Sequence, residues 1–153
     1  MVISFERVNP SNLSEYASLE NSALIYFISR TRPYNYHEKT ESTLFWKYIC
    51  LNNERIGAVW LEKENEKSEV VILGIFIAKD ENTCKGIGQT AIENAIEQAS
   101  CEMCFTRIEL HVRGNNPRAI ACYKKCGFIE TNRFFGERTG KQVEAVTMIV
   151  DKI

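Results

Sequence analysis

The sequence predicts an α/β fold with a mixed sheet, built around one parallel strand–helix–strand unit. Residues 69–78 form a nearly unbroken apolar run, which is typical of a strand buried on both faces. Residues 87–100 place apolar side chains on one helical face, and residues 107–112 read as the next strand. A strand, a helix and a strand in this order require a parallel crossover. The hairpins expected on either side are antiparallel, so the sheet is mixed.

The first 45 residues are expected to contribute one strand, one helix and a polar segment. Residues 2–8 alternate in polarity and predict a strand. Ser11 or Ser14 is expected to cap a short amphipathic helix that ends near Asn21. Residues 29–45 are polar, dotted with aromatic side chains and weakly periodic. We expect them to form a loop or a broken helix that borders a binding site.

A hairpin is predicted between the polar segment and the apolar strand. Residues 45–51 and 55–63 have strand character, and Asn52 and Asn53 between them form a turn signal. The elements expected near the C-terminus are a short helix opened by Pro117 (117–126) and two strands (129–135 and 144–150).

Composition indicates a globular protein, with residues 1–153 as a single domain. Hydrophobic residues make up 44% of the chain and charged residues 25%. Lysine plus arginine number 19 against 20 aspartate plus glutamate, which disfavours general nucleic-acid binding because that needs a basic surface. The apolar stretches are too short for a membrane span, and the N-terminus lacks the apolar region of a signal peptide. We therefore expect a cytoplasmic protein that contacts no membrane.

Six cysteines are few for a disulfide scaffold of this length, and a protein that is not exported should keep them reduced. Cys101 and Cys104 form a C-x-x-C pair, and Cys122 and Cys126 follow within a helical pattern. A zinc site with four thiolates usually has a second C-x-x-C pair, which this chain lacks. We expect thiols packed in the core and no metal.

The sharpest local feature is Lys85-Gly86-Ile87-Gly88, between the apolar strand and the amphipathic helix. Glycines allow a tight turn that presents backbone N–H groups, and a helix N-terminus adds partial positive charge. Lys85 adds a further positive charge. This combination predicts a site for a pyrophosphate group.

Dinucleotide binding is a second interpretation of the same glycines. Gly86-x-Gly88-x-x-Ala91 matches the nicotinamide fingerprint, and Glu109 follows at about the spacing of 20 residues that the fingerprint requires. In that fingerprint the first glycine follows its strand almost at once, whereas residues 79–85 intervene here. A nicotinamide-dependent oxidoreductase is therefore the less favoured alternative.

A second motif follows the next strand and decides between these interpretations: Asn116-x-x-Ala119-x-x-x-Tyr123-x-x-x-Gly127-Phe128. Together with the glycines it resembles the GNAT superfamily of N-acetyltransferases. Members of that superfamily show a Gln/Arg-x-x-Gly-x-Gly/Ala loop and then this second motif. The resemblance covers residues 68–150. Thr83 stands where the family usually has Gln or Arg, which leaves the backbone from Cys84 to Gly88 to hold the phosphates.

The resemblance implies a sheet of six or seven strands with about four helices, in which the two central parallel strands splay apart. The pantetheine arm of acetyl-CoA would lie between them and pair with the first strand, whose backbone amides would also polarise the thioester carbonyl. The residues implied to contact acetyl-CoA are Phe76, Ile77, Ala78, Thr83, Cys84, Lys85, Gly86, Ile87, Gly88, Gln89, Asn116 and Tyr123.

The resemblance also implies catalytic roles. Tyr123 matches the general acid that protonates the departing thiolate of CoA. Asn116 matches a residue that contacts the CoA arm, and it is also placed to cap its helix. Ribosomal-protein N-terminal acetyltransferases, a branch with a similar strand and helix, place a glutamate base at the position of His111. An imidazole accepts protons near neutral pH, so we expect His111 to be the base and Glu109 to be the reserve.

The function that follows is acetyl transfer from acetyl-CoA to an amine of a small molecule or protein, by direct attack in a ternary complex. The acceptor groove is expected from residues 20–50 and 130–145. We expect acetyl-CoA and an amine as partners, and a homodimer is the assembly considered. A non-catalytic acyl-CoA-binding or sensor module is the alternative from another functional class.

Overall fold

The computed structural model describes residues 2–22, 30–78, 86–138 and 140–152. These residues form three α-helices, one 3-10 turn and a seven-stranded sheet in the order β1-β2-β3-β4-β5-β7-β6. Only β4 and β5 are parallel among the described strand pairs, so the predicted mixed sheet is confirmed. The elements are β1 (Ile3–Arg7), α1 (Ser14–Asn21), η2 (Tyr36–Glu38), β2 (Leu44–Leu51), β3 (Glu54–Lys63), β4 (Val70–Ile77), α2 (Ile87–Glu102), β5 (Arg107–Arg113), α3 (Pro117–Lys125), β6 (Ile129–Arg138) and β7 (Lys141–Asp151).

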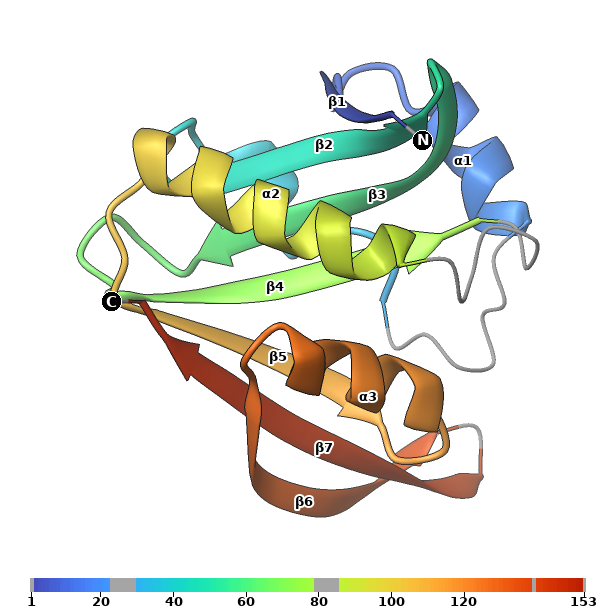
Figure 1. Ribbon diagram of the computed structural model, residues 1–153, viewed down its shortest axis with the longest axis vertical. Coiled ribbons are helices and arrows are strands. Elements are labelled where there is room, and N and C mark those ends of the chain that lie inside the picture. Colours follow the sequence, from blue (N-terminus) through green and yellow to red (C-terminus); the bar gives the residue numbers. More distant parts are fainter. Residues whose placement is uncertain (1, 23–29, 79–85, 139, 153) are drawn as a thin grey trace.

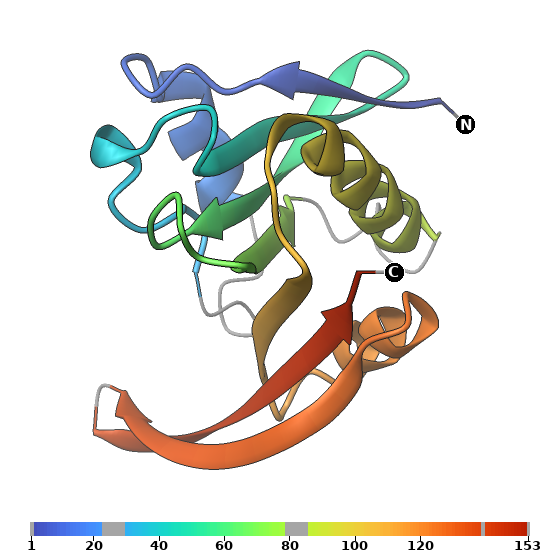
Figure 2. The ribbon, with the colours of Figure 1, turned by 90° about the vertical axis from the view of Figure 1, so that its left-hand side faces the viewer.

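Helices cover both faces of the sheet. Figure 1 shows α2 across β2–β4 and α3 beside β5 and β7, and Figure 2 shows α1 on the side of the sheet opposite α2. The larger core cluster lies under α2 and α3, and the smaller one, around Tyr16 of α1 and Trp60 of β3, lies on the other face. Side chains along β4 alternate between the two clusters. Val71 and Leu73 face α2, whereas Phe76 and Ala78 face α1. This confirms the prediction of a strand buried on both faces.

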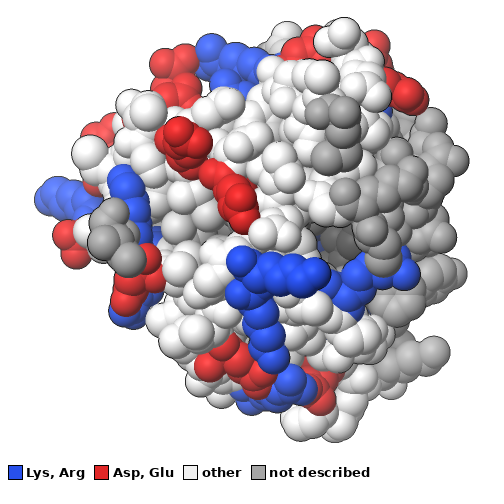
Figure 3. Space-filling model, viewed as in Figure 1, with Lys and Arg blue, Asp and Glu red and all other residues white. Residues whose placement is uncertain are grey.

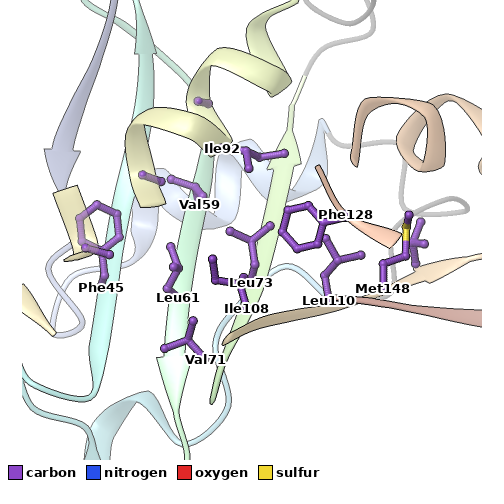
Figure 4. Packing of buried hydrophobic residues seen from close by; sticks show 14 of the residues in the cluster. Phe45, Val59, Leu61, Val71, Leu73, Ile92, Ile108, Leu110, Phe128 and Met148 are labelled. Atoms are coloured by element: carbon purple, nitrogen blue, oxygen red, sulfur yellow. The ribbon is translucent and has the colours of Figure 1, made fainter. Parts of the chain in front are cut away.

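The two central strands separate after a short paired region. Only Val70–Ile72 pair with Arg107–Glu109, although β4 and β5 both continue beyond that point. Figure 1 shows β4 and β5 diverging from their paired ends. On the α2 and α3 side, Figure 4 shows Phe128 between Leu73 and Leu110, so the core stays continuous across the separated strands. The region after Ile72 in which the backbones of β4 and β5 no longer pair is called the opening.

Two of the expected details near the N-terminus differ. The predicted helix is present, but Leu13 is its N-terminal cap residue and makes no side-chain capping bond. The Ser14 hydroxyl instead donates to Oδ1 of Asn12, which precedes the helix, at 3.1 Å. The polar segment contains the 3-10 turn η2, and its last residues belong to β2. The hairpin prediction is confirmed, with Asn52 and Asn53 at φ of 50° and 70°.

The cysteine prediction is partly wrong. Cys101 and Cys104 are exposed rather than in the core, because Cys101 lies off the buried face of α2 and Cys104 follows the end of that helix. Cys122 and Cys126 are half-buried on α3. No three His, Cys, Asp or Glu side chains gather as metal ligands within the described residues. No helix in the described ranges is both long and apolar enough to cross a membrane.

Candidate active site

The N-terminus of α2 lies beside the opening of the sheet. Gly86 precedes the helix with φ of 75°, a left-handed conformation that favours glycine. An added Cβ on Gly86 would meet no described atom within 4 Å. Ile87 is buried and anchors this turn in the core, and the Gln89 amide donates to Glu93 Oε1 at 3.0 Å. Thr83, Cys84 and Lys85 lie outside the described residues.

Gly88 faces α3, and the packing between the two helices leaves room for a larger side chain at this position. A Cβ on Gly88 would lie 3.6 Å from Cys122 Sγ, which is ordinary van der Waals contact. Glycine inside a helix is less favourable than alanine by about 1 kcal/mol. Neither packing nor helix propensity therefore explains Gly88, whereas close approach of a ligand would.

The second motif forms α3 as predicted. Asn116 caps the helix, with its Oδ1 accepting the Ala119 N–H at 3.2 Å, and Pro117 occupies the first helical position. Tyr123 packs on Phe128 with ring centroids 6.1 Å apart. Burial, with smaller contributions from Cys122 and Cys126, raises the pKa of Tyr123 well above its ordinary value. The phenol is therefore protonated at neutral pH, as a general acid must be.

The neighbouring thiols form a pair one helical turn apart. A hydrogen bond from Cys126 lowers the pKa of Cys122 to about 7, an effect that burial opposes and Lys125 reinforces. The same hydrogen bond raises the pKa of Cys126. Cys122 lies beside Tyr123 on the helix, and nothing in this geometry assigns it a place in the transfer of an acyl group.

Glu109 and His111 lie together on β5, on the face away from α3. His111 Nε2 is 3.3 Å from Glu109 Oε2, and its Nδ1 is 3.2 Å from Thr147 Oγ1 of β7. Both ring nitrogens are thus held by neighbours, while 42% of the His111 side chain stays exposed.

One row of side chains crosses the opening on this same face. Ile72 and Glu109 form the last β4–β5 pair, so the next residues on the same face are Gly74 and His111. Gly74 pairs with Trp60 of β3. A Cβ on Gly74 would overlap the Trp60 ring, which means that the indole lies directly over β4. The row therefore runs from Trp60 over Gly74 to His111 and Thr147.

Comparison with known proteins identifies the family of this chain. The family model described as "Acetyltransferase (GNAT) family" matches residues 12–128. The chain belongs to the GNAT acetyltransferase family. It is 30% identical over 131 residues to the spermidine N(1)-acetyltransferase of Vibrio cholerae, covering 78% of this chain and 75% of that protein.

Solved structures share the GNAT fold over nearly the whole chain. A GNAT acetyltransferase from Streptococcus pneumoniae has a TM-score of 0.79 at 19% identity, covering 99% of this chain and 100% of that one. The V. cholerae spermidine N-acetyltransferase in complex with CoA and spermine has a TM-score of 0.75 at 21% identity, covering 97% of this chain and 95% of that one. The chain is therefore an acyltransferase, which overturns the nicotinamide interpretation.

The GNAT sheet corrects one expected contact with the cofactor arm. The Ala78 N–H donates to the Ile56 carbonyl of β3 at 2.6 Å, so it is not directed into the opening. Because backbone groups alternate along a strand, those of Phe76 also point toward β3. The backbone groups that face the opening belong to Ile75 and Ile77, which alternate with them. Of the expected Phe76–Ala78 segment, only the backbone groups of Ile77 face the opening.

Sequence patterns did not predict some features of the site. Figure 3 shows Lys and Arg side chains over α3. The basic residues of α3 include Lys124 and Lys125 in its last turn. Trp60 and Thr147 were also missed, because residues far apart in the sequence bring them to the opening. Gly74, alone in an apolar strand, was the one available signal of a close approach.

Proposed function

We propose that this chain transfers the acetyl group of acetyl-CoA to an amine of a small molecule or protein. One observation carries the proposal: the opening between β4 and β5 has Tyr123 on one face of the sheet and the Glu109–His111 pair on the other. A proton donor and a proton acceptor on opposite sides of a gap suit a reaction that passes through it. The incoming amine loses a proton on one side, and the leaving thiolate gains one on the other.

The α2 N-terminus supplies the phosphate site in this proposal. The backbone N–H groups of Gly86 to Gln89 would bind the pyrophosphate, favoured by the helix dipole. The pantetheine arm would pair with the open backbone edge of β4 at Ile75 and Ile77, and Asn116 would contact it from the start of α3. Lys124 and Lys125 place positive charge on the same side of the sheet.

The chemical steps then follow from the residues on each side. The amine nitrogen, deprotonated by the Glu109–His111 pair, attacks the thioester carbonyl and forms a C–N bond. Backbone N–H groups at the edge of β4 stabilise the oxyanion of the tetrahedral intermediate. As the C–S bond breaks, Tyr123 donates its proton to the sulfur, so acetylated amine and CoA thiol are the products. No step requires a metal ion.

Two classes of amine are acceptors to test. The similar V. cholerae enzyme acts on spermidine, which makes a polyamine one acceptor to test. The resemblance to ribosomal-protein N-terminal acetyltransferases makes a peptide α-amine another. A cytoplasmic location and a homodimer also belong to the proposal.

Release of CoA thiol with a panel of amines tests this function directly. We expect acetyl-CoA to raise the midpoint of thermal unfolding, and at least one amine to support thiol release. Stabilisation by acetyl-CoA without transfer to any amine would favour the binding-module alternative. Absence of both effects would contradict the proposed cofactor site.

Gly88→Ala is expected to separate ligand binding from folding. The added methyl fits against Cys122 and improves helix propensity, so the free energy of unfolding should stay level or rise by up to about 1 kcal/mol. Acetyl-CoA affinity should fall about 10-fold, because the methyl occupies space where the phosphate would approach the helix backbone. Denaturant unfolding and calorimetric titration measure the two effects. Equal affinity in both proteins would remove Gly88 from the site.

His111→Ala and Glu109→Gln together test the proposed base. If His111 accepts the proton, its removal should lower kcat/KM about 100-fold and change the acidic limb of the pH–rate profile. Glu109→Gln should then have a smaller effect, because it only loosens the imidazole. The acetyl-CoA affinity of both variants should match that of the native protein. The reverse order of effects would assign the base to Glu109.

A further inference from the structure

Two thiols on α3 form a pair that the proposed acetyl transfer does not use. Cys122 and Cys126 lie one helical turn apart, and both residues are half-buried. A hydrogen bond from the Cys126 thiol to the Cys122 sulfur joins them, and both side chains pack at the edge of the larger core cluster. The two sulfur atoms are therefore in contact, and solvent reaches part of each residue.

The surroundings of Cys122 favour the thiolate, which is the reactive form of a cysteine. The hydrogen bond from Cys126 lowers the pKa of Cys122 to about 7, so about half of this thiol is ionised at neutral pH. Lys125 of the same helix also lowers the pKa, whereas burial and Glu93 of α2 raise it. Cysteines that respond to oxidants combine a lowered pKa, access to solvent and a second cysteine within reach. This pair has all three properties.

The pair lies where a chemical change would reach the proposed site. A Cβ on Gly88 would lie 3.6 Å from Cys122 Sγ, so this thiol faces the first turn of α2, where the phosphate is proposed to bind. Tyr123 lies in the turn that separates the two cysteines. Its carbonyl accepts the N–H groups of Cys126 and Phe128, each at 3.0 Å. Movement of Cys126 would therefore change the hydrogen bonds of the turn that holds Tyr123.

A disulfide between the two cysteines requires a change in this turn. The Cα atoms of residues i and i+4 of an α-helix are about 6 Å apart, which lies inside the range of disulfides. Their Cβ atoms are about 5–6 Å apart, which exceeds the roughly 4 Å that a disulfide needs. Cys126 is the C-terminal cap of α3, and helix ends fray more easily than helix interiors. It can therefore move toward Cys122 while the body of the helix stays in place.

We infer that Cys122 is a site of oxidation by peroxides, that Cys126 converts the product to a disulfide, and that this disulfide inhibits the proposed acetyl transfer. With hydrogen peroxide, the Cys122 thiolate attacks one oxygen, the O–O bond breaks, and hydroxide leaves as a sulfenic acid forms. The Cys126 sulfur then attacks the sulfenic sulfur, and its proton leaves with the hydroxyl group as water. The hydroxide takes up the proton that Cys122 released on ionising. In total, two thiols are oxidised and one peroxide is reduced to two waters.

The first step removes the obstacle to the second. In the reduced pair, the hydrogen bond to Cys122 is the largest cause that raises the pKa of Cys126. A sulfenic acid carries no negative charge at Cys122, so this cause disappears and Cys126 ionises more readily. A disulfide that strains its surroundings is also more easily reduced. A thiol reductant should therefore reverse the modification, as expected for the transient disulfides of reducing compartments.

Tryptic mapping after peroxide treatment tests the oxidation without any assay of activity. Trypsin cleaves at the two lysines between the cysteines, so Cys122 and Cys126 fall on different peptides, 119–124 and 126–133. We expect hydrogen peroxide to join these peptides in the native protein and dithiothreitol to separate them. A disulfide of the exposed C-x-x-C pair would instead stay within peptide 86–107. A Cys122 that iodoacetamide still alkylates completely after peroxide treatment overturns the inference.

The ratio of kcat before and after peroxide treatment tests the inhibition, which rests on the proposed acetyl transfer. Oxidation of the native protein should lower kcat at least 10-fold, because the bridge displaces Tyr123, and dithiothreitol should restore it. Cys122→Ala should keep the same kcat through the treatment. Cys101→Ala removes an exposed thiol of α2 and is the matched control, which should lose as much activity as the native protein. Equal losses in the native protein and Cys122→Ala would overturn the inhibition.

Cys126→Ala separates the two chemical steps. Oxidation should then stop at the sulfenic acid of Cys122, which dimedone traps on peptide 119–124. Loss of the hydrogen bond should also slow alkylation of Cys122 by iodoacetamide at pH 7 about 10-fold. An unchanged alkylation rate, or no dimedone adduct, would contradict the assigned roles. Joined peptides in the native protein without acetylation of any amine would support the oxidation and contradict only the proposed function.

Discussion

Replacing Gly86 by Asp is expected to reduce acetyl-CoA affinity at least 100-fold, or about 3 kcal/mol. The new carboxylate would lie at the α2 N-terminus, where the pyrophosphate is proposed to bind. Two unit charges about 4 Å apart repel by about 4 kcal/mol at an effective dielectric constant of about 20, and solvent screening reduces this value. Calorimetric titration of the folded variant with acetyl-CoA measures the loss.

The same variant should remain folded. Gly86 has φ of 75°, and Asp and Asn adopt this left-handed conformation more readily than other residues with a Cβ. An added Cβ meets no described atom within 4 Å, and a carboxylate is favourable at a helix N-terminus. Gly86→Asn is the matched control, since it adds the Cβ without the charge and should retain more affinity than Gly86→Asp. Native affinity in Gly86→Asp would refute the phosphate site.

Tyr123→Phe is expected to lower kcat about 100-fold, toward the lower end of the range for general acid catalysis. Only the hydroxyl is lost, and the ring contact with Phe128 is kept. The KM for acetyl-CoA should change little, because the bond from the phenol to sulfur strengthens only as negative charge develops there. Steady-state kinetics with a competent amine, at saturating acetyl-CoA, measures the effect.

A buried tyrosine outside the proposed site provides the control. Tyr48→Phe removes a hydroxyl from β2 in the smaller core cluster and should leave kcat within about 2-fold of native. Because burial raises the pKa of Tyr123, the native enzyme should keep its acid protonated well into the alkaline range. If Tyr123→Phe retained the native kcat, Tyr123 would have only a structural role in the motif. The thiolate would then leave without a proton donor.

The local patterns of the sequence determined most of the elements and one half of the proposed site. Apolar spacing predicted α2, β4 and β5, and the asparagine turn predicted the β2–β3 hairpin, because each depends on neighbours only a few residues apart. The second motif placed Asn116 at the start of α3 and Tyr123 two turns later. Capping of α1 failed as a prediction, because Leu13 takes the cap position and no side chain closes that end.

Only the tertiary structure decided where the opening lies and what borders it. Local sequence patterns do not predict where β4 and β5 stop pairing, since Phe128, which is distant in sequence from β4, packs between Leu73 and Leu110. The same long-range register directs the Ala78 N–H to Ile56 and lays Trp60 over Gly74, in line with His111. Strand pairing joins residues distant in sequence, so the set of side chains that borders the opening is a property of the folded sheet rather than of any one segment.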